Sequence, residues 1–221
     1  MEGTVRMSLE QLATLAVAAI TGYLIGSIPF PQIFVRLKLH GDLRSTPTGN
    51  VGVMNSMHLL GRPLGLAVLL SEAVKGAACA WIGLQLAGDI GGWAALVAAV
   101  AGANWSVWLR GAGGRGNTTF AGGVLVLAPL LFVLMAAIYA IARAVSGSSF
   151  IAARLQIWLM PVTFGLYGWW ALGDRRAALA WAASGLAFAL IFRVKHSRST
   201  DDHLAYSVRR HEREEHDRSA G

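Results

Sequence analysis

The sequence predicts an all-α integral membrane protein, and three observations carry that prediction. Hydrophobic residues make up 55% of the 221 residues and charged residues only 14%, against about 25% charged residues in a soluble domain. The charges gather in short loops and after residue 193. Apolar stretches of about 20 residues, long enough to cross a bilayer, recur along the chain. The basic residues behind the net charge of +7 flank these stretches, which argues against a soluble nucleic-acid-binding protein.

Each apolar stretch predicts one helical segment. In the first span, Pro29 and Pro31 predict a kink or an early stop. Residues 37–61 are polar and contain glycine, so we expect an irregular loop there. Residues 88–92 predict a tight turn between the second and third spans. The predicted full spans are 9–35, 64–86, 93–109, 150–172 and 177–192.

Residues 118–142 are apolar but contain Pro129, which predicts two half-helices that dip into the membrane and return. The bundle then has about seven helical segments, in a membrane domain of residues 1–193 followed by a charged tail of residues 194–221. Basic residues cluster at 36–62, 110–115 and 193–198, and the positive-inside rule places all three regions in the cytoplasm and the N-terminus outside. That orientation requires one later segment not to cross, and the proline-broken one is the best candidate.

A polar segment between the first two spans offers hydroxyls, amides and backbone N–H groups to an anion. If a helix begins near Asn50, its N-terminus adds partial positive charge. An ordinary loop with a helix cap explains the same residues equally well. The candidate phosphate-binding residues here are Arg44, Ser45, Thr48, Gly49, Asn50, Gly52 and Asn55.

Two charged residues, Glu72 and Lys75, lie inside the second span and share a helix face. Charges within a membrane are costly and usually functional, so Lys75 is a further candidate for binding phosphate. The alternative is a structural pair that neutralises itself.

The segment Gly113-Gly114-Arg115-Gly116 lies between two apolar stretches. Glycines leave backbone N–H groups unshielded and arginine adds a forked cation, so the segment suits a phosphate or carboxylate at a membrane edge. A positive-inside anchor on a flexible linker is the alternative.

Ser146 and Ser149 form a further polar cluster before a predicted span, where serines also serve as helix caps. His196 follows the last span, and a lone histidine in a basic tail is usually solvated. Cys79 is the only cysteine, and the histidines lack the spacing of a metal site, so we expect no metal site.

The order and spacing of these motifs resemble the bacterial acyl-phosphate:glycerol-3-phosphate acyltransferase (PlsY) family. The similarity runs from about Gly22 to Ser199, nearly the whole membrane part. The motifs that carry it are Gly22–Phe30, Thr48–Asn55, Glu72 with Lys75-Gly76, Gly113–Gly116, Val145–Ser149 and His196.

The resemblance implies an enzyme that moves an acyl chain from acyl phosphate to glycerol 3-phosphate, giving lysophosphatidic acid for phospholipid synthesis. It implies a multi-pass protein of the bacterial plasma membrane, seven helical segments, a site facing the cytoplasm and no metal or nucleotide cofactor. Ser146 and His196 are then catalytic candidates beside glycerol 3-phosphate. Gly49, Asn50, Asn55 and the 113–116 segment are then candidates for holding phosphate.

Several positions differ from the family pattern. They are Thr48, Met54, His58, Ala103, Arg115 and Ser199, where the family has serine, threonine, arginine, histidine, lysine and asparagine. The changes at 58, 103 and 199 favour an alternative, a non-catalytic or repurposed relative that binds a lipid headgroup or a membrane partner. A small transporter is a third hypothesis, which the intramembrane charges and the broken helix favour.

Overall fold

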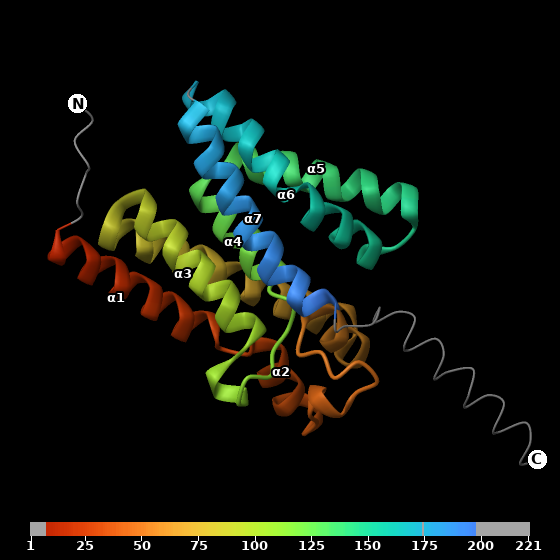
Figure 1. Cartoon of the computed structure of the whole chain (residues 1–221). Helices are drawn as coiled ribbons and strands as arrows, with labels where there is room; N and C mark the ends of the chain where they lie inside the picture. Colours follow the sequence, from red (N-terminus) through yellow and green to blue (C-terminus); the bar gives the residue numbers. More distant parts are fainter. Residues whose placement is uncertain (1–7, 174, 198–221) are drawn as a thin grey trace, which may run out of the picture. The chain divides into compact units, whose positions relative to one another are not determined.

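The computed structural model describes residues 8–173 and 175–197, and all regular structure in that part is helical (Figure 1). The predicted all-α fold is confirmed. The described chain forms two compact units, one from residues 8–29 and 69–132, the other from residues 30–68 and 133–197. The elements are α1 (Leu9–Gly26), α2 (Phe30–Leu39), η1 (Leu43–Ser45), α3 (Val53–Asn104), η2 (Val107–Leu109), α4 (Asn117–Leu127), α5 (Pro129–Ser146), α6 (Ser149–Leu172) and α7 (Arg175–Ser197).

The first predicted span is interrupted where its prolines predict. Ser8 caps α1 through a capping box with Gln11. α1 ends at Gly26 and α2 begins at Phe30, so Pro29 lies in the break between them.

α3 is helical over its 52 residues but reverses direction inside them. Gly61 and Gly88 have φ angles of 76° and 61°, in the left-handed region that glycine adopts readily. Gly83 and Gly91 touch backbone to backbone, which is impossible for residues eight apart in a straight helix. The yellow part of the ribbon in Figure 1 therefore turns back on itself, and the tight turn predicted at 88–92 is confirmed.

The prediction of an irregular loop over residues 37–61 is wrong at both ends. α2 continues to Leu39, and α3 begins at Val53, close to the helix start considered near Asn50. The apolar residues Val53, Met57 and Leu60 recur with the i, i+4, i+7 spacing of a helix face, and this signal outweighs the turn preference of the neighbouring asparagine and glycine.

The break predicted at Pro129 is present, because α4 ends at Leu127 and α5 begins at Pro129. α4 is short, at 11 residues. α5 runs four residues past the predicted end at 142 and has 18 residues, since Gly147, with a φ of 69°, ends it only after Ser146. A helix of that length and apolarity can cross a membrane, so only α4 has the length expected of a half-helix.

Small residues let the helices of the first unit approach closely. A Cβ at Gly22 or Gly26 of α1 would overlap the backbone of Ala95 or Ala99 in α3. Likewise, a Cβ at Gly122 of α4 would overlap the carbonyl oxygen of Ala73. Glycine and alanine are typical of such contacts in membranes, where helix association relies on close van der Waals packing.

In the second unit, α6 and α7 pack as an antiparallel pair around aromatic side chains. The rings of Phe164 and Phe188, both fully buried, lie 6.1 Å apart between centroids. The rings of Tyr167 and Trp181 lie 5.1 Å apart, within the range of favourable aromatic contacts. Gly185 allows α7 to approach the Met160 carbonyl.

Four helical stretches in the described residues are long and apolar enough to cross a membrane: Leu9–Leu39, Val53–Leu109, Pro129–Ser146 and Ser149–Ala171.

Replacing Gly122 by alanine should destabilise the protein by about 1–3 kcal/mol, because the added methyl group overlaps Ala73 and forces α4 away from α3. Thermal unfolding in detergent micelles measures this loss. Gly41→Ala is the matched control, since its nearest contact would be an ordinary 3.4 Å to a Val35 methyl group. Equal unfolding temperatures for the two variants would contradict the close packing of α3 and α4.

Candidate active site

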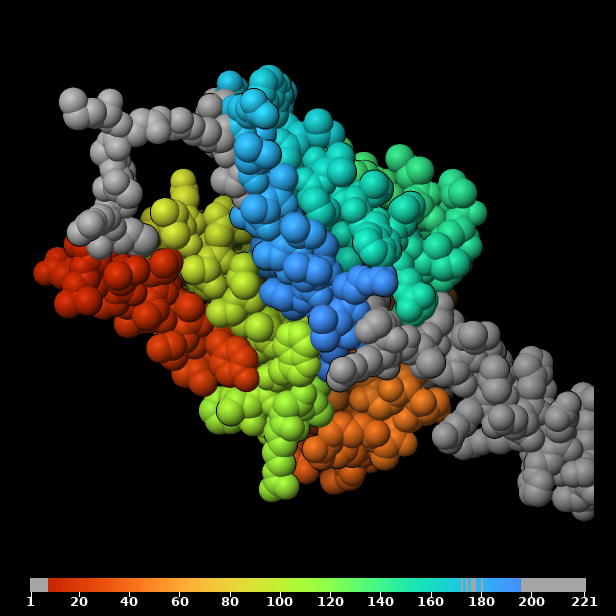
Figure 2. Space-filling model, in the orientation of Figure 1, coloured from red at the N-terminus to blue at the C-terminus, as the bar shows by residue number. Residues whose placement is uncertain are grey.

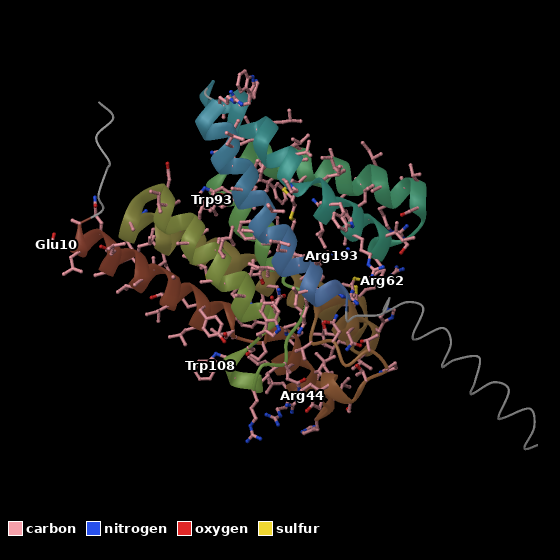
Figure 3. All side chains as sticks on the ribbon, viewed as in Figure 1. Glu10, Arg44, Arg62, Trp93, Trp108 and Arg193 are labelled. Atoms are coloured by element: carbon pink, nitrogen blue, oxygen red, sulfur yellow. The ribbon has the colours of Figure 1, made fainter. Side chains whose placement is uncertain are left out.

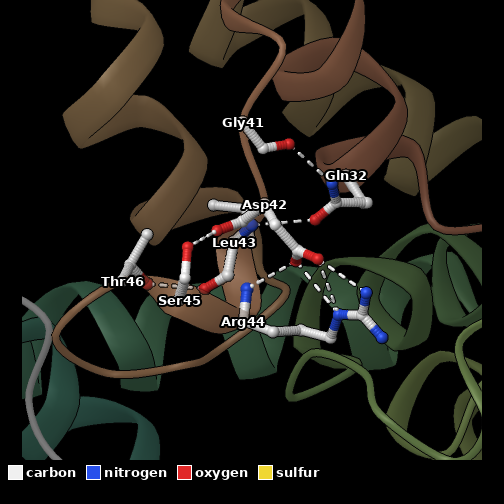
Figure 4. Close-up of polar contacts among 7 residues, drawn as sticks. All are labelled: Gln32, Gly41, Asp42, Leu43, Arg44, Ser45 and Thr46. Atoms are coloured by element: carbon white, nitrogen blue, oxygen red, sulfur yellow. Dashed lines mark hydrogen bonds and ion pairs between the residues drawn. The ribbon is translucent and has the colours of Figure 1, made fainter.

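The polar loop after α2 is held by side chains of its own unit (Figure 4). The buried amide of Gln32 donates to the Gly41 carbonyl at 3.0 Å and accepts from the Leu43 N–H at 2.9 Å. Asp42 accepts hydrogen bonds from the Arg44 backbone N–H and from its Nε and Nη2 atoms, the last at 2.6 Å. These bonds hold the pKa of the Asp42 carboxyl below its ordinary value. The predicted phosphate ligand Arg44 is therefore partly neutralised by its neighbour.

The rest of this loop is organised around Asn55, which is fully buried. Its Nδ2 atom donates to the Asn50 carbonyl at 2.6 Å and to Thr46 Oγ1 at 2.7 Å. Thr48 Oγ1 accepts from the Asn50 N–H at 3.4 Å, and Gly49 has a φ of 60°. The structure thus brings Thr48, Gly49, Asn50 and Asn55 together, with Asn55 fixing the shape of the loop.

The charged pair in α3 belongs to a buried network of the first unit. Lys75 Nζ donates to Glu72 Oε1 at 2.8 Å and to the Ile28 carbonyl at 2.9 Å. The second carboxylate oxygen of Glu72 accepts from Thr119 Oγ1 at 2.8 Å. Glu72 and Lys75 are 6% and 4% exposed. The network joins α3 to α4 and to the break between α1 and α2. Its additional hydrogen bonds offset the cost of removing the ion pair from water.

The glycine loop lies against the C-terminal end of α3. The Gly114 N–H donates to the Ala103 carbonyl at 2.9 Å, and a Cβ at Gly113 would lie 2.5 Å from the carbonyl oxygens of Ala103 and Asn104. We expected the glycines to leave N–H groups unshielded. For Gly114 this expectation is wrong, because its N–H is bonded to the Ala103 carbonyl. At Gly113, the close approach of the loop to α3 leaves no room for a side chain.

Arg115 is half-buried, and α4 begins two residues later with Gly116, at a φ of 72°, as its N-cap residue. No side chain caps that helix start through a hydrogen bond. The charge of Arg115 thus lies two residues before the start of α4 in the chain, and both that charge and the partial positive charge of the helix N-terminus favour an anion.

The serine cluster forms the turn between α5 and α6. Ser146 Oγ bonds with the carbonyl and N–H of Ser148 at 3.2 and 3.3 Å, and Ser148 caps α6 by accepting from the Ile151 N–H. Ser149 Oγ accepts from Arg143 Nε at 3.1 Å. The predicted residues Ser146 and Ser149 are thus neighbours in a capping turn. His196 lies in the last turns of α7, and its side chain falls outside the described part.

Sequence reasoning missed Gln32, Asp42 and Thr119. Thr119 had a signal, since it lies in the first turn of the apolar helix that follows the glycine loop. Asp42 lies two residues from Arg44, a spacing that allows a local ion pair. Among residues 8–173 and 175–197, no cluster of three or more histidine, cysteine, aspartate or glutamate side chains is placed to hold a metal ion.

Comparisons with known proteins show the family of the chain. The family model described as glycerol-3-phosphate acyltransferase matches residues 16–205. The chain belongs to this family. It is 35% identical to glycerol-3-phosphate acyltransferase 1 of Rhizobium johnstonii over 165 residues, covering 75% of this chain and 78% of that one. It is 38% identical to the glycerol-3-phosphate acyltransferase of Sinorhizobium fredii over 161 residues, covering 73% and 76%.

The fold is also that of the acyltransferase family. Crystal structures of PlsY (YgiH), an integral membrane glycerol 3-phosphate acyltransferase, match in a glycerol 3-phosphate form and a lysophosphatidic acid form, with TM-scores of 0.66 and 0.64. Each match is 23% identical and covers 85% of this chain and 94% of that one. The predictions of family and of a multi-pass membrane protein are confirmed.

Glu72→Gln should destabilise the protein by about 3–5 kcal/mol, because it leaves the buried Lys75 ammonium without a carboxylate. Adding Lys75→Met should restore most of the lost stability, since the buried charge without a carboxylate is then removed. Thermal unfolding of the single and double variants in detergent measures both effects.

Thr119→Val is the control for this pair, because it removes one hydrogen bond and leaves the two charges paired, at a cost of about 1 kcal/mol. A double variant less stable than Glu72→Gln alone would contradict the charge-pair explanation.

Proposed function

We propose that this protein transfers an acyl chain from acyl phosphate to glycerol 3-phosphate, producing lysophosphatidic acid and inorganic phosphate. The observation that carries the proposal is the family match over residues 16–205. The loops described above support it, because both substrates carry phosphate and the chain offers a glycine loop, an arginine and a helix N-terminus to bind it.

The chemistry asks little of the protein beyond positioning and charge. The 1-hydroxyl oxygen of glycerol 3-phosphate attacks the acyl carbonyl carbon, an ester bond forms, and the bond from that carbon to the phosphate oxygen breaks. Phosphate leaves with the electron pair, and a base takes the hydroxyl proton. Because acyl phosphate is already activated, holding the two substrates together supplies much of the rate. Cations and N–H groups aimed at the carbonyl oxygen and the departing phosphate supply the rest.

The residue roles extend what the resemblance implies and are part of the proposal. The 113–116 loop binds phosphate, with Arg115 neutralising the leaving group. Ser146 orients glycerol 3-phosphate, and His196 accepts the hydroxyl proton, a role that suits an imidazole near neutral pH. The remaining candidates at the phosphate groups are Arg44, Ser45, Thr48, Gly49, Asn50, Gly52, Asn55, Lys75 and Ser149. For Asn55 and Lys75, their hydrogen bonds favour a positioning role, in which they fix the loops that touch substrate.

A relative that binds a lipid headgroup without turnover is the second candidate. Two observations favour it: Arg44 is paired with Asp42, and position 103, where the family pattern has histidine, is an alanine that contributes only its carbonyl to the glycine loop. Lysophosphatidic acid or another anionic lipid that copurifies with a protein showing no acyl transfer would support this candidate.

Arg115→Ala should lower acyl transfer from palmitoyl phosphate to glycerol 3-phosphate by about 100-fold, because a charge aimed at the leaving phosphate is lost. Arg115→Lys should keep most of the activity, since it keeps the charge. Arg110→Gly is the matched control: it removes a nearby charge and suits the φ of 55° at that position. The assay uses purified protein in detergent, and an Arg115→Ala enzyme as active as the wild type would overturn the assigned role.

For orientation, we propose that the N-terminus lies outside and that the polar loops face the cytoplasm, from the distribution of basic residues. A cysteine placed at Ser146 should react with a membrane-impermeant thiol reagent only from the cytoplasmic side, and one at Arg175 only from the outer side. The native Cys79, 1% exposed, is replaced by alanine to clear the background. Labelling of the Ser146→Cys protein in intact cells would show that the orientation is opposite to the one proposed.

A further inference from the structure

Two carbonyl groups at the C-terminal end of α1 accept hydrogen bonds from side chains 79 and 84 residues further along the chain. The last carbonyls of an α-helix have no partners within the helix itself. Ser106 Oγ donates to the Ser27 carbonyl at 2.5 Å, and Trp108 Nε1 donates to the Leu24 carbonyl at 3.4 Å. The end of α1 is therefore bound to the turn that follows α3.

A further bond between the same two segments runs in the opposite direction, since Tyr23 Oη donates to the Trp105 carbonyl at 2.9 Å. Glycine permits the approach, because a Cβ at Gly102 would lie 2.4 Å from the Tyr23 carbonyl oxygen. Figure 2 shows the end of α1, in red, against the yellow-green atoms of the turn, and Figure 3 shows Trp108 beside that end. Among the described residues, three side-chain bonds thus fasten residues 105–108 to α1, all within the first unit.

Ser106 also closes the turn that leads into the glycine loop. Its N–H donates to the Ala112 carbonyl at 3.0 Å, and its carbonyl accepts from the Gly111 N–H at 2.8 Å. Gly113, the first residue of the glycine loop, follows Ala112 directly in the chain. The backbone of Ser106 thus holds the start of the glycine loop, while its side chain holds α1.

Helix capping does not explain the direction of the Ser106 hydroxyl. Ser106 is the N-cap residue of η2, a position where serine ordinarily accepts from an N–H group of its own helix. The N–H groups of the described η2 residues receive no such bond from it, and the hydroxyl donates to α1 instead. Ser106 is 1% exposed and Ser27 is fully buried. Loss of the hydroxyl would therefore leave a buried carbonyl without its donor, which is costly.

We propose that Ser106 is a positioning residue, which fixes the glycine loop of residues 113–116 to the end of α1 and so holds it in the conformation that binds phosphate. This inference rests on the proposed function, in which that loop binds the phosphate group of acyl phosphate. The apparent affinity for a ligand falls in proportion to the fraction of molecules in the binding conformation. Once phosphate is bound the loop is in place in every molecule, so Ser106 governs substrate binding more than turnover.

The test measures binding of inorganic phosphate to the purified full-length protein in detergent, from the rise in unfolding temperature with phosphate concentration. Ser106→Ala should weaken phosphate binding about fivefold, because a buried hydrogen bond that orders the loop is lost. In acyl transfer the same variant should raise the KM for palmitoyl phosphate about fivefold and leave kcat within about twofold of the wild type. Tyr23→Phe removes a different bond to the same turn and should also weaken phosphate binding.

Two further variants serve as controls. Cys79→Ala removes a side-chain donor from the same contact between α1 and α3, where Cys79 Sγ donates to the Gly22 carbonyl at 3.8 Å, and leaves the turn untouched. It should keep the phosphate affinity and the KM of the wild type. Arg115→Ala should lose most of the stabilisation by phosphate, which assigns the bound phosphate to the glycine loop.

Unchanged phosphate binding by Ser106→Ala overturns the proposal. An equal loss in Cys79→Ala also overturns it, because α1 would then be loosened in general. A wild type that does not bind inorganic phosphate, or an Arg115→Ala protein that binds it normally, has the same consequence. If Ser106→Ala does not fold, unchanged binding by Tyr23→Phe overturns the proposal. Absence of acyl transfer in the wild type rejects the proposed function alone, since the phosphate measurement needs no turnover.

Discussion

The close approach of helix backbones is the constraint on which the first unit depends. In lipid, helices gain little from the hydrophobic effect against one another, so contact depends on small residues. Gly76 shows the consequence, because a side chain there would overlap the Thr119 carbonyl. The same approach brings the Thr119 hydroxyl to the carboxylate of Glu72, which is paired with Lys75. Glu72, Lys75 and Gly76 therefore act together. Gly76 allows α4 to approach α3 closely, and the ion pair accepts the hydrogen bond that holds α4 in place.

The second unit is organised by local polar bonds and by aromatic packing. Gln32 and Asn55 fix a loop through their amides, so its shape does not require a substrate. Ser148 caps α6 in the same manner. Each candidate loop is thus preorganised by residues of its own unit, which suits an enzyme whose catalytic power comes from placing fixed charges around an activated substrate.

The helices, the breaks near Pro29 and Pro129 and the turn at Gly88 follow from the sequence, because hydrophobic runs, proline and glycine act locally. The prediction of an irregular loop failed from Val53 onward, since asparagine and glycine near the helix start favour turns. A helix beginning near Asn50 was considered only as an alternative. In the candidate site, the sequence indicates which residues are chemically suitable. It does not reveal that the Gly114 N–H is bonded to Ala103, because that contact depends on how the loop folds back on α3.

The pairing of Glu72 with Lys75 also bears on how the chain enters the membrane. The two residues are one helical turn apart, so their ion pair forms within a single helix as soon as that helix exists. Thr119 is made later, since synthesis proceeds from the N-terminus. The helix is thus able to enter the bilayer with its charges already neutralised, and α4 later finds a carboxylate oxygen still open to its hydroxyl. A local pair thereby serves first as a means of insertion and then as an assembly point.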